Sequence, residues 1–458
     1  MVFRIEQKML TTLILLSTPL PSLTKRNDEV NEIMRDVFLT SHPNHHQGRI
    51  KKPFTLSNPD NNEHSEKNHL CFPFHEFPHD LLLTTASFTP DLSKVDNHCS
   101  DVESVTFQQH LKKLGNPAEC IVGNQLTTDN VGYGLGSVIN SWTKPFMFAI
   151  SSKLSFWSPP LGSYVDGKGL GRGDRCKMDS MACFFQPLSK CEMEPKLIGE
   201  KPGCWNSDVL PRRKCINKVI AENRSLDKQS LMNQKLDENG YPKNVPIQWR
   251  HNGHFWYTSQ LLHYMLGRPN RNFHGSLERV KQSSGFNEAP RPMLSLHVRR
   301  GDSCDSYQEE SKKRRCDSLS YYMKEAVIPL AKKYGIKSIF LATDDADTIA
   351  QANHYPQFTW VYVEEQDRSK VKKLKWEANL KNGVMDNYGE AQAALTDLHL
   401  LSLGDAFVGK FTSNLDRIAY SMLVGRKQGL APYVSLDSNW CSDWGRKTGR
   451  SKFGEFYC

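Results

Sequence analysis

The chain has 458 residues, of which 38% are hydrophobic and 24% charged, and its formal net charge is +9. This length and composition exclude a fibrous or wholly disordered protein and favour two compact lobes over one. The modest positive excess suits an anionic ligand, although an ordinary basic surface explains it more simply. No block of Lys and Arg is interleaved with aromatic residues, so the sequence does not favour binding of nucleic acid.

The N-terminal region divides into an apolar run and a polar tract. The run Met9–Leu20 is shorter than the roughly 20 residues that a helix needs to cross a bilayer, so we expect a signal peptide or short signal anchor over residues 1–22. A stray hydrophobic segment of a soluble protein is the alternative. Residues 23–103 are rich in His, Pro, Asn and charge without apolar periodicity, which predicts a flexible stem.

The twelve cysteines indicate the compartment. Their number is even, most stand singly, and no CxxC pair or Cys/His cluster at zinc spacing occurs, so disulfides are favoured over a metal site. Cys304 and Cys316 bracket a polar loop that a local bridge would close. The glycosylation sequon that begins at Asn223 agrees with a secretory location.

Predicted order begins near Cys120. Residues 120–124 read as a buried strand, 129–134 as a turn, 133–150 as a helix and 154–157 as a second strand. The following stretch, to about Asp237, is rich in Cys, Gly and Pro and includes a Gly-rich loop at 167–173 without a strand–loop–helix frame. We expect residues 104–290 to form an N-terminal lobe on the acceptor side.

The second half alternates strands with helices. We expect strands at 293–298, 338–343, 359–363 and 406–411, with helices at 318–333, 345–353 and 390–403. The first helix is capped near Asp317, and a fourth begins at Ser413 and is stopped by Gly425. This rhythm predicts an α/β fold with a doubly wound parallel sheet in a C-terminal lobe, residues 291–458.

Polar residues follow three of these strands, where parallel sheets bind ligands. Guanidinium groups there bind phosphate, and Ser and Thr at a helix start offer hydroxyls and free N–H groups. The glycines of an upstream turn allow close approach to a ligand. Taken singly, an Arg pair is usually a surface ion-pair partner and a Thr-Ser pair usually a cap. The candidate donor-binding residues are Gly132, Tyr133, Gly134, His297, Arg299, Arg300, Asp344, Asp345, Asp397, Thr412 and Ser413.

Several segments resemble the α-1,6-fucosyltransferase family, which is related to nodulation and protein O-fucosyltransferases. The segment 297–302 (HVRRGD) resembles its HVRRTD motif, and 341–345 (LATDD) its ATDD segment. Residues 396–402, 411–413 and 417–420 are similar to a third block, while 130–134 and 255–260 are similar to further segments. The likeness covers roughly residues 120–440, with the segments in the family's order.

The resemblance implies a GT-B-like fold and an inverting transfer from GDP-β-L-fucose without metal or cofactor, in the Golgi lumen. The acceptor it implies is a glycan or glycoprotein, with an α-1,6 linkage to the core GlcNAc of N-glycans. By position, Arg299 would hold the β-phosphate, and His297 and Asp397 would contact guanine. Gly134 and Ser413 would support the phosphates.

The general base is the open point, because the chain departs from the family here. Gly301 and Ser303 replace a Thr and a Lys, and the segment after them is longer and flanked by cysteines. An inverting transfer needs a carboxylate near the acceptor hydroxyl. The candidate catalytic residues are Arg299, Asp302, Glu309 and Glu310, with Asp305 as a further carboxylate. A polypeptide or chito-oligosaccharide acceptor and a non-catalytic nucleotide-sugar-binding relative are the alternatives.

Two short patterns suggest other functions. The RGD strings 172–174 and 300–302 occur in adhesion ligands, but the second directly follows a buried strand. The DxD pattern from Asp345 to Asp347 holds metal in other glycosyltransferases, but here it opens a helix. We therefore expect neither adhesion nor a metal site.

Overall fold

The computed structural model of the chain describes residues 70–77, 81–96, 99–120, 125–126, 134–151, 153–159, 161–165, 176, 180–191, 247–301, 316–364, 379, 382 and 385–441. All of them belong to one compact unit that begins at Ser65. The signal-anchor segment predicted for residues 1–22 lies outside the described residues. The boundary expected at residue 290 stays a prediction.

The elements follow one another in a regular order. The strands are β1 (Ser87–Phe88), β2 (Gln125–Leu126), β3 (Ser155–Phe156), β4 (Met293–Val298), β5 (Ser338–Thr343), β6 (Thr359–Val361), β7 (Ala406–Gly409) and β8 (Tyr433–Ser435). The α-helices are α2 (Leu81–Thr84), α3 (Val102–Gly115), α4 (Leu135–Ser141), α5 (Thr143–Ser151), α9 (Gly253–Leu266), α10 (Arg271–Ser283), α12 (Leu319–Tyr322), α13 (Ile328–Tyr334), α14 (Ala346–Ala352), α16 (Asn387–Leu401) and α17 (Asn414–Lys427). A π-helical turn, Met323–Val327, joins α12 to α13, and short 3₁₀ turns occur at Phe74–Glu76, Leu92–Lys94, Gly162–Tyr164, Met181–Cys183 and Ile247–Asn252.

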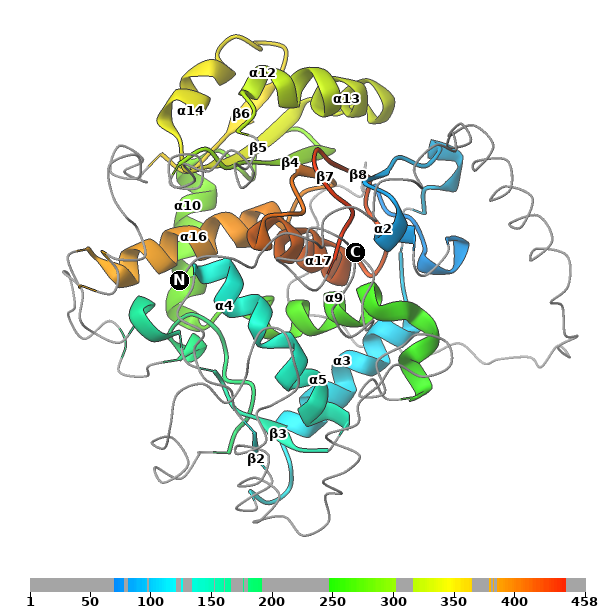
Figure 1. Cartoon of the computed structure of the whole chain (residues 1–458), viewed down its shortest axis with the longest axis vertical. Coiled ribbons are helices and arrows are strands. Elements are labelled where there is room, and N and C mark those ends of the chain that lie inside the picture. Colours follow the sequence, from blue (N-terminus) through cyan, green and yellow to red (C-terminus); the bar gives the residue numbers. More distant parts are fainter. Residues whose placement is uncertain are drawn as a thin grey trace, which may run out of the picture. The chain divides into compact units, whose positions relative to one another are not determined.

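The central sheet has the strand order β1-β8-β7-β4-β5-β6. Strands β8, β7, β4, β5 and β6 run parallel, and β1 joins the edge antiparallel to β8. Every residue of β4, β5 and β7 is buried, as expected for parallel strands covered on both faces. Helices α12, α13 and α14 cover one face, and α16 and α17 cover the other (Figure 1). The predicted α/β fold with a doubly wound parallel sheet is confirmed.

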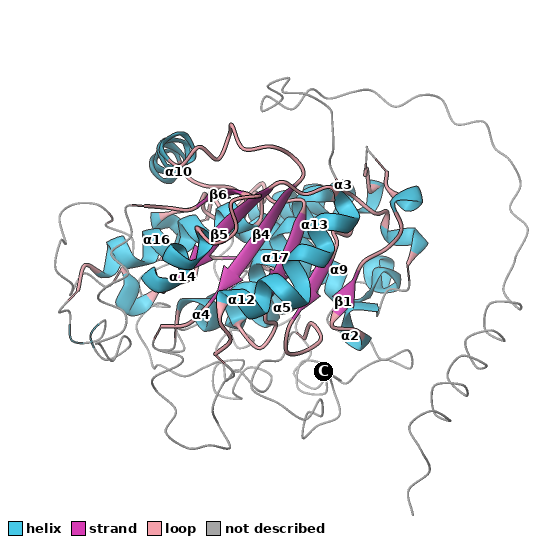
Figure 2. Ribbon diagram, turned by 90° about the horizontal axis from the view of Figure 1, so that it is seen from above, coloured by secondary structure: helices cyan, strands magenta, loops and turns pink. Residues whose placement is uncertain are grey.

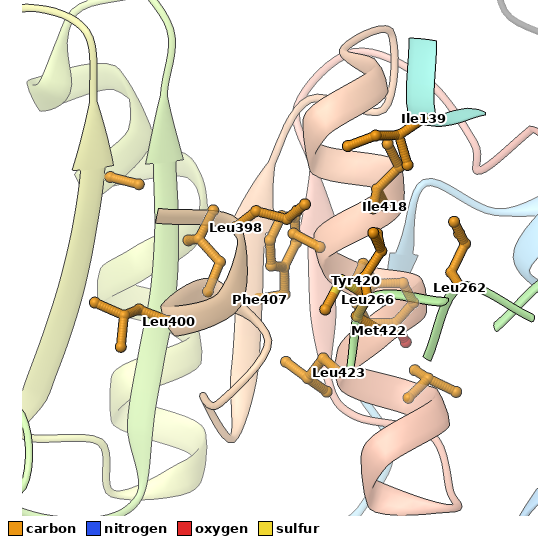
Figure 3. Packing of buried hydrophobic residues seen from close by; sticks show 14 of the residues in the cluster. Ile139, Leu262, Leu266, Leu398, Leu400, Phe407, Ile418, Tyr420, Met422 and Leu423 are labelled. Atoms are coloured by element: carbon orange, nitrogen blue, oxygen red, sulfur yellow. The ribbon is translucent and has the colours of Figure 1, made fainter. Parts of the chain in front are cut away.

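The core continues from the sheet into a second helical layer. Helix α9 packs on α17 with one side and on α3 and α5 with the other, and almost its whole length is buried. In Figure 2 the strands of the sheet lie side by side with helices around them. Figure 3 shows the apolar contact through which β7, α16, α17, α4 and α9 share one core, with labelled side chains Ile139, Leu262, Leu266, Leu398, Leu400, Phe407, Ile418, Tyr420, Met422 and Leu423.

The prediction that order begins near Cys120 is wrong. Helix α3 starts at Val102, capped by Asp101. Before it, Phe72 pairs with Leu430, and β1 pairs with β8 at the edge of the sheet. Phe72 is fully buried, and Phe88 of β1 stacks on Tyr433. These elements are two to four residues long, apart from α3, so they carry little periodicity. The part of the expected stem from residue 70 to 103 therefore belongs to the folded unit.

One predicted helix start is confirmed, and one predicted helix end is wrong. The cap of α12 is Ser318, next to Asp317, and its Oγ accepts the N–H of Tyr321. Helix α17 continues through Gly425 to Lys427. A Cβ at Gly425 would lie 2.6 Å from the carbonyl oxygen of Ser259 in α9. This glycine therefore permits close helix packing and does not end the helix.

Disulfides are present, as the cysteine pattern predicted. The described pairs are Cys71–Cys99, Cys120–Cys191 and Cys176–Cys183. Cys316 is also disulfide-bonded, but Cys304 lies outside the described residues, so the Cys304–Cys316 pairing stays a prediction. Among the described helices, none combines the length and the apolar character needed to cross a membrane.

Candidate active site

Three neighbouring strands end at the same edge of the sheet. Strand β4 lies between β7 and β5 and is parallel to both, with His297 paired with Ala342 and Leu296 with Val408. The carboxyl ends of these strands therefore deliver the polar segments 297–301, 343–345 and 410–413 to one place. The sequence predicted this convergence, and the structure confirms it.

Asp344 holds the chain that leaves β4. One of its carboxylate oxygens, Oδ1, accepts the backbone N–H of Arg300 at 2.7 Å and that of Gly301 at 2.9 Å. Next to it, the hydroxyl of Thr343 donates to the carbonyl of Val298 at 2.7 Å. These bonds tie the ends of β4 and β5 together and fix the backbone on which Arg299 stands.

The two arginines after β4 have different surroundings. The Arg300 guanidinium is partly buried and lies 3.5 Å from Oδ2 of Asp345, a carboxylate that is almost fully buried. The same oxygen accepts the N–H and the hydroxyl of Thr348, so Asp345 caps α14. Arg299 is exposed. Of the pair, Arg299 is therefore the guanidinium that a ligand reaches from solvent.

The DxD pattern separates into two unlike positions. Asp345 is buried in the cap just described, whereas Asp347 is exposed in the first turn of α14. Within the described part of the chain, no group of three or more His, Cys, Asp and Glu side chains is placed to hold a metal ion. The expectation that the reaction needs no metal or cofactor stays a prediction.

The third segment forms a helix N-terminus. Ser413 caps α17, and its Oγ accepts the N–H of Asp416 at 3.5 Å. The hydroxyl of Thr412 donates to Asp437, which follows β8. The first turn of a helix carries unpaired backbone N–H groups and the positive end of the helix dipole. This corner therefore suits a phosphate group.

Asp416 is a site residue that the sequence reasoning missed. Its Oδ1 pairs with Nδ1 of His297, and its Oδ2 accepts the backbone N–H of Lys410 at 2.7 Å. Burial alone would lower the pKa of His297, but the charge and hydrogen bond of Asp416, with a further contribution from Asp344, outweigh burial and the repulsion of Arg299, so the pKa is raised. The sequence feature that could have revealed Asp416 is its place in the first turn of the helix that follows β7.

Lys410 and Asp317 form a second unpredicted pair at this edge. The Lys410 ammonium lies 2.7 Å from Oδ2 of Asp317 and 5.6 Å from the ring centre of Tyr322. Burial raises the pKa of the Tyr322 hydroxyl well above its usual value, and the carboxylates of Asp416, Asp437, Asp317 and Asp344 raise it further. The pair joins the end of β7 to the chain that enters α12.

Helix α4 meets the same corner from the first half of the chain. Asn414 donates to the hydroxyl of Ser137 at 2.8 Å, and a Cβ at Gly136 would lie 3.0 Å from the backbone nitrogen of Leu415. Gly134 is the cap residue of α4. Gly136 and Ser137, which follow Gly134 in the chain, thus contact the start of α17. The expectation that the glycine turn itself lies against the ligand stays a prediction, and Gly132 and Tyr133 lie outside the described residues.

The comparisons with known proteins identify the family. Residues 175–439 match the family described as "Alpha-(1,6)-fucosyltransferase N- and catalytic domains". The chain belongs to this family.

The chain has a curated relative and solved structures to which it is similar at low sequence identity. The chain is 28% identical over 174 residues to the alpha-(1,6)-fucosyltransferase of Drosophila melanogaster, which is 37% of this chain and 25% of that protein. The chain thus spans about a quarter of the length of this curated relative. Among solved structures it is similar to POFUT1 in complex with GDP (12% identity, 69% of this chain and 100% of that one, TM-score 0.38). It is also similar to the fucosyltransferase NodZ from Bradyrhizobium (12% identity, 65% and 91%, TM-score 0.33).

The remaining predicted site residues of this fucosyltransferase-family chain are Asp397 and the candidate base carboxylates. Asp397 is partly buried in α16, which packs along β4 and β5, and its contact with a guanine base stays a prediction. Asp302, Glu309, Glu310 and Asp305 lie outside the described residues. Their assignment as candidate base or site carboxylates therefore also stays a prediction.

Proposed function

We propose that this chain is an inverting fucosyltransferase that moves L-fucose from GDP-β-L-fucose to a glycan, most specifically in α-1,6 linkage to the core GlcNAc of N-glycans. The observation that carries the proposal is the meeting of exposed Arg299 and the N-terminus of α17 at the ends of β4, β5 and β7. A guanidinium group and a helix N-terminus are both suited to bind the phosphates of a nucleotide. Membership of the α-1,6-fucosyltransferase family supports the choice of sugar.

The residues at the edge account for the departure of GDP. The acceptor hydroxyl attacks C1 of fucose on the face opposite the nucleotide, and the bond from C1 to the β-phosphate oxygen breaks. Negative charge then grows on the β-phosphate, where a guanidinium and helix N–H groups stabilise it more strongly than in the bound substrate. Arg299 and the first turn of α17 supply these groups in the proposal.

A carboxylate takes the proton of the acceptor hydroxyl. The candidates Asp302, Glu309 and Glu310, with Asp305, lie in sequence between Gly301 and Cys316. Gly301 is held by Asp344, and Asp317, directly after Cys316, pairs with Lys410. Both ends of this segment are thus attached to the site edge, which supports a base from within it.

We further propose that the reaction needs no metal or cofactor and takes place in the secretory pathway. The disulfides support the location, since such bonds persist in oxidising compartments. Anchoring of the N-terminal segment in the membrane belongs to the same proposal.

Transfer by the full chain tests the proposal directly. The protein is incubated with GDP-fucose, EDTA and a biantennary N-glycan ending in GlcNAc, and GDP release and the fucosylated glycan are measured. We expect both products, and Arg299→Ala is expected to reduce kcat/KM by about a hundredfold or more. Arg279→Ala, which removes an exposed guanidinium on α10, is the matched control and is expected to retain full turnover.

The other outcomes separate the alternatives. Fucose transfer to a folded polypeptide domain or a chito-oligosaccharide, but not to the N-glycan, would replace the acceptor and leave the donor in place. Tight binding of GDP-fucose without transfer to any of these acceptors would favour a non-catalytic nucleotide-sugar-binding protein. Activity that is lost in EDTA and restored by Mn²⁺ would overturn metal independence. Absence of GDP-fucose binding would overturn the proposal as a whole.

A further inference from the structure

The carboxylate of Asp416 connects three parts of the site edge. It is 2% exposed, and it stands in the first turn of α17. Its Oδ1 meets Nδ1 of His297 at the end of β4, while its Oδ2 accepts the N–H of Lys410 just after β7. A buried carboxylate with both oxygens engaged has little freedom to move, so it is suited to hold another side chain in place.

Gly409 provides an independent sign that the fold makes room for this carboxylate. A Cβ at Gly409 would lie 2.9 Å from Oδ2 of Asp416 and 3.0 Å from its Cγ. It would also lie 2.9 Å from the ring of Phe407. Any larger residue at position 409 would therefore displace Asp416 from its contact with His297.

We propose that Asp416 is a positioning residue, which binds the His297 imidazole through Nδ1–H and so leaves Nε2 as the nitrogen that meets the bound nucleotide. This inference rests on the proposed function, since it concerns the donor site of the same reaction. A carboxylate on one ring nitrogen fixes both the tautomer and the orientation of the ring. Protonation of His297 then occurs at Nε2, which changes from an acceptor of hydrogen bonds to a donor towards the bound nucleotide.

The charges around His297 give the proposal a pH dependence. Asp416 on α17 and Asp344 after β5 favour the imidazolium, whereas burial and Arg299 after β4 disfavour it. Without the charge of Asp416, burial and Arg299 would prevail and the pKa would fall. Donor binding by an Asp416→Asn variant is therefore expected to weaken at neutral pH and to recover as the pH is lowered.

The first experiment measures the ring itself, without any ligand. In ¹⁵N-histidine-labelled full chain, the His297 signals are assigned by their loss in His297→Gln, and both ring nitrogens are titrated. We expect a proton on Nδ1 throughout and a pKa that falls in Asp416→Asn. An unchanged titration in Asp416→Asn, or a neutral tautomer with its proton on Nε2, would overturn the proposal. This arm gives its answer even when no nucleotide binds.

The second experiment measures GDP affinity by calorimetry between pH 5.5 and 8. Loss of one hydrogen bond to a charged group predicts an affinity about ten- to a hundredfold lower for Asp416→Asn at pH 7.5, with recovery towards pH 5.5. Gly409→Ala is expected to behave in the same way. In a His297→Gln background, Asp416→Asn should add little further loss; a full additional loss there would show that Asp416 does not act through His297.

Matched controls separate positioning from a general loss of structure. Asp405 is also a buried carboxylate that accepts a backbone N–H, from Met293 at 2.9 Å, but it precedes β7 at the opposite edge of the sheet. Gly404, where a Cβ would meet the hydroxyl of Ser295, is the counterpart of Gly409. Asp405→Asn and Gly404→Ala are expected to lower thermal stability without changing the pH dependence of GDP binding. The same pH dependence in these controls would contradict the proposal.

Discussion

The carboxylate of Asp344 accepts the backbone N–H of Gly301 at 2.9 Å, and this bond ties the end of β5 to the chain leaving β4. The same oxygen accepts the N–H of Arg300 at 2.7 Å. Arg299 stands immediately before these two residues, with its side chain exposed. The orientation of Arg299 therefore depends on Asp344, whose carboxylate binds the backbone next to Arg299.

Asp344→Ala is expected to reduce kcat/KM for fucose transfer by about ten- to a hundredfold, because misplacement of a catalytic group by about an ångström has that effect. Asp344→Asn should fall between Ala and wild type, since its amide oxygen still accepts one or both N–H groups. Steady-state kinetics check both variants. Asp347→Ala, which removes an exposed carboxylate three residues away, is the control. Equal activity of Asp344→Ala and wild type would show that these bonds do not position the arginine.

The protein is expected to lose stability in acid because of two histidines, His399 and His263. Burial, followed by the charges of nearby Lys and Arg side chains, lowers the pKa of His399 to about 3 and that of His263 to about 4. The unfolded chain takes up these protons near pH 6.5, whereas the folded chain does not. Stability is therefore fully present above pH 6.5 and is lost as the pH falls towards 4, by on the order of a few kcal/mol in total.

Denaturant unfolding at a series of pH values measures this loss. The matched comparison is His399→Gln, which cannot take up a proton and is expected to flatten the slope of unfolding free energy between pH 6.5 and 4. His297 contributes with the opposite sign, because its raised pKa stabilises the fold at low pH and the contribution is lost as the pH rises through that pKa. A slope that is the same with and without His399 would refute the assignment.

The second half of the chain could be predicted from sequence because its signals are local. The runs 293–298 and 338–343 are short and mostly apolar, and the structure begins and ends β4 and β5 at those residues. The ends of buried parallel strands then point to the ligand site without further information. This reasoning placed Arg299, Asp344 and Ser413 at one edge of the sheet, and the structure has each of them directly after a strand or at a helix cap. Their roles in ligand binding stay predictions.

The unpredicted parts depend on contacts between distant segments. Asp416 lies within a helix, and only the folded arrangement of the chain brings it to His297, 119 positions away. The local sequence predicts that the helix ends at Gly425. In the structure this glycine instead allows α17 to pack closely against Ser259 of α9. The short elements before α3 have almost no periodicity, and their pairing with β8, together with the Cys71–Cys99 bridge, holds them on the sheet.

Gly425→Ala is expected to destabilise the protein although Ala favours helices. The added Cβ would lie 2.6 Å from the Ser259 carbonyl oxygen and 2.7 Å from Cβ of His263, so α17 and α9 would have to separate. Overpacking of this kind costs about 1–3 kcal/mol. Gly275→Ala is the control, since the nearest atom to its Cβ is the Arg279 guanidinium at 3.8 Å, and it should stabilise α10 by about 0.5–1 kcal/mol. Thermal unfolding of both variants checks the contrast; stabilisation by both would show that α17 and α9 adjust freely.

The Lys410–Asp317 pair is expected to behave as a buried ion pair. Both side chains are largely shielded, at 14% and 7% exposed, and the ammonium lies 2.7 Å from the carboxylate. Lys410→Met removes the ammonium that lies beside a buried carboxylate and should cost about 3–5 kcal/mol of stability, and Asp317→Leu should cost a similar amount. The double variant is expected to recover much of the loss, because it leaves neither charge uncompensated. Chemical denaturation of the four proteins gives the coupling energy. Additive losses would mean that the two side chains do not depend on each other, and that the end of β7 and the start of α12 are joined by other contacts.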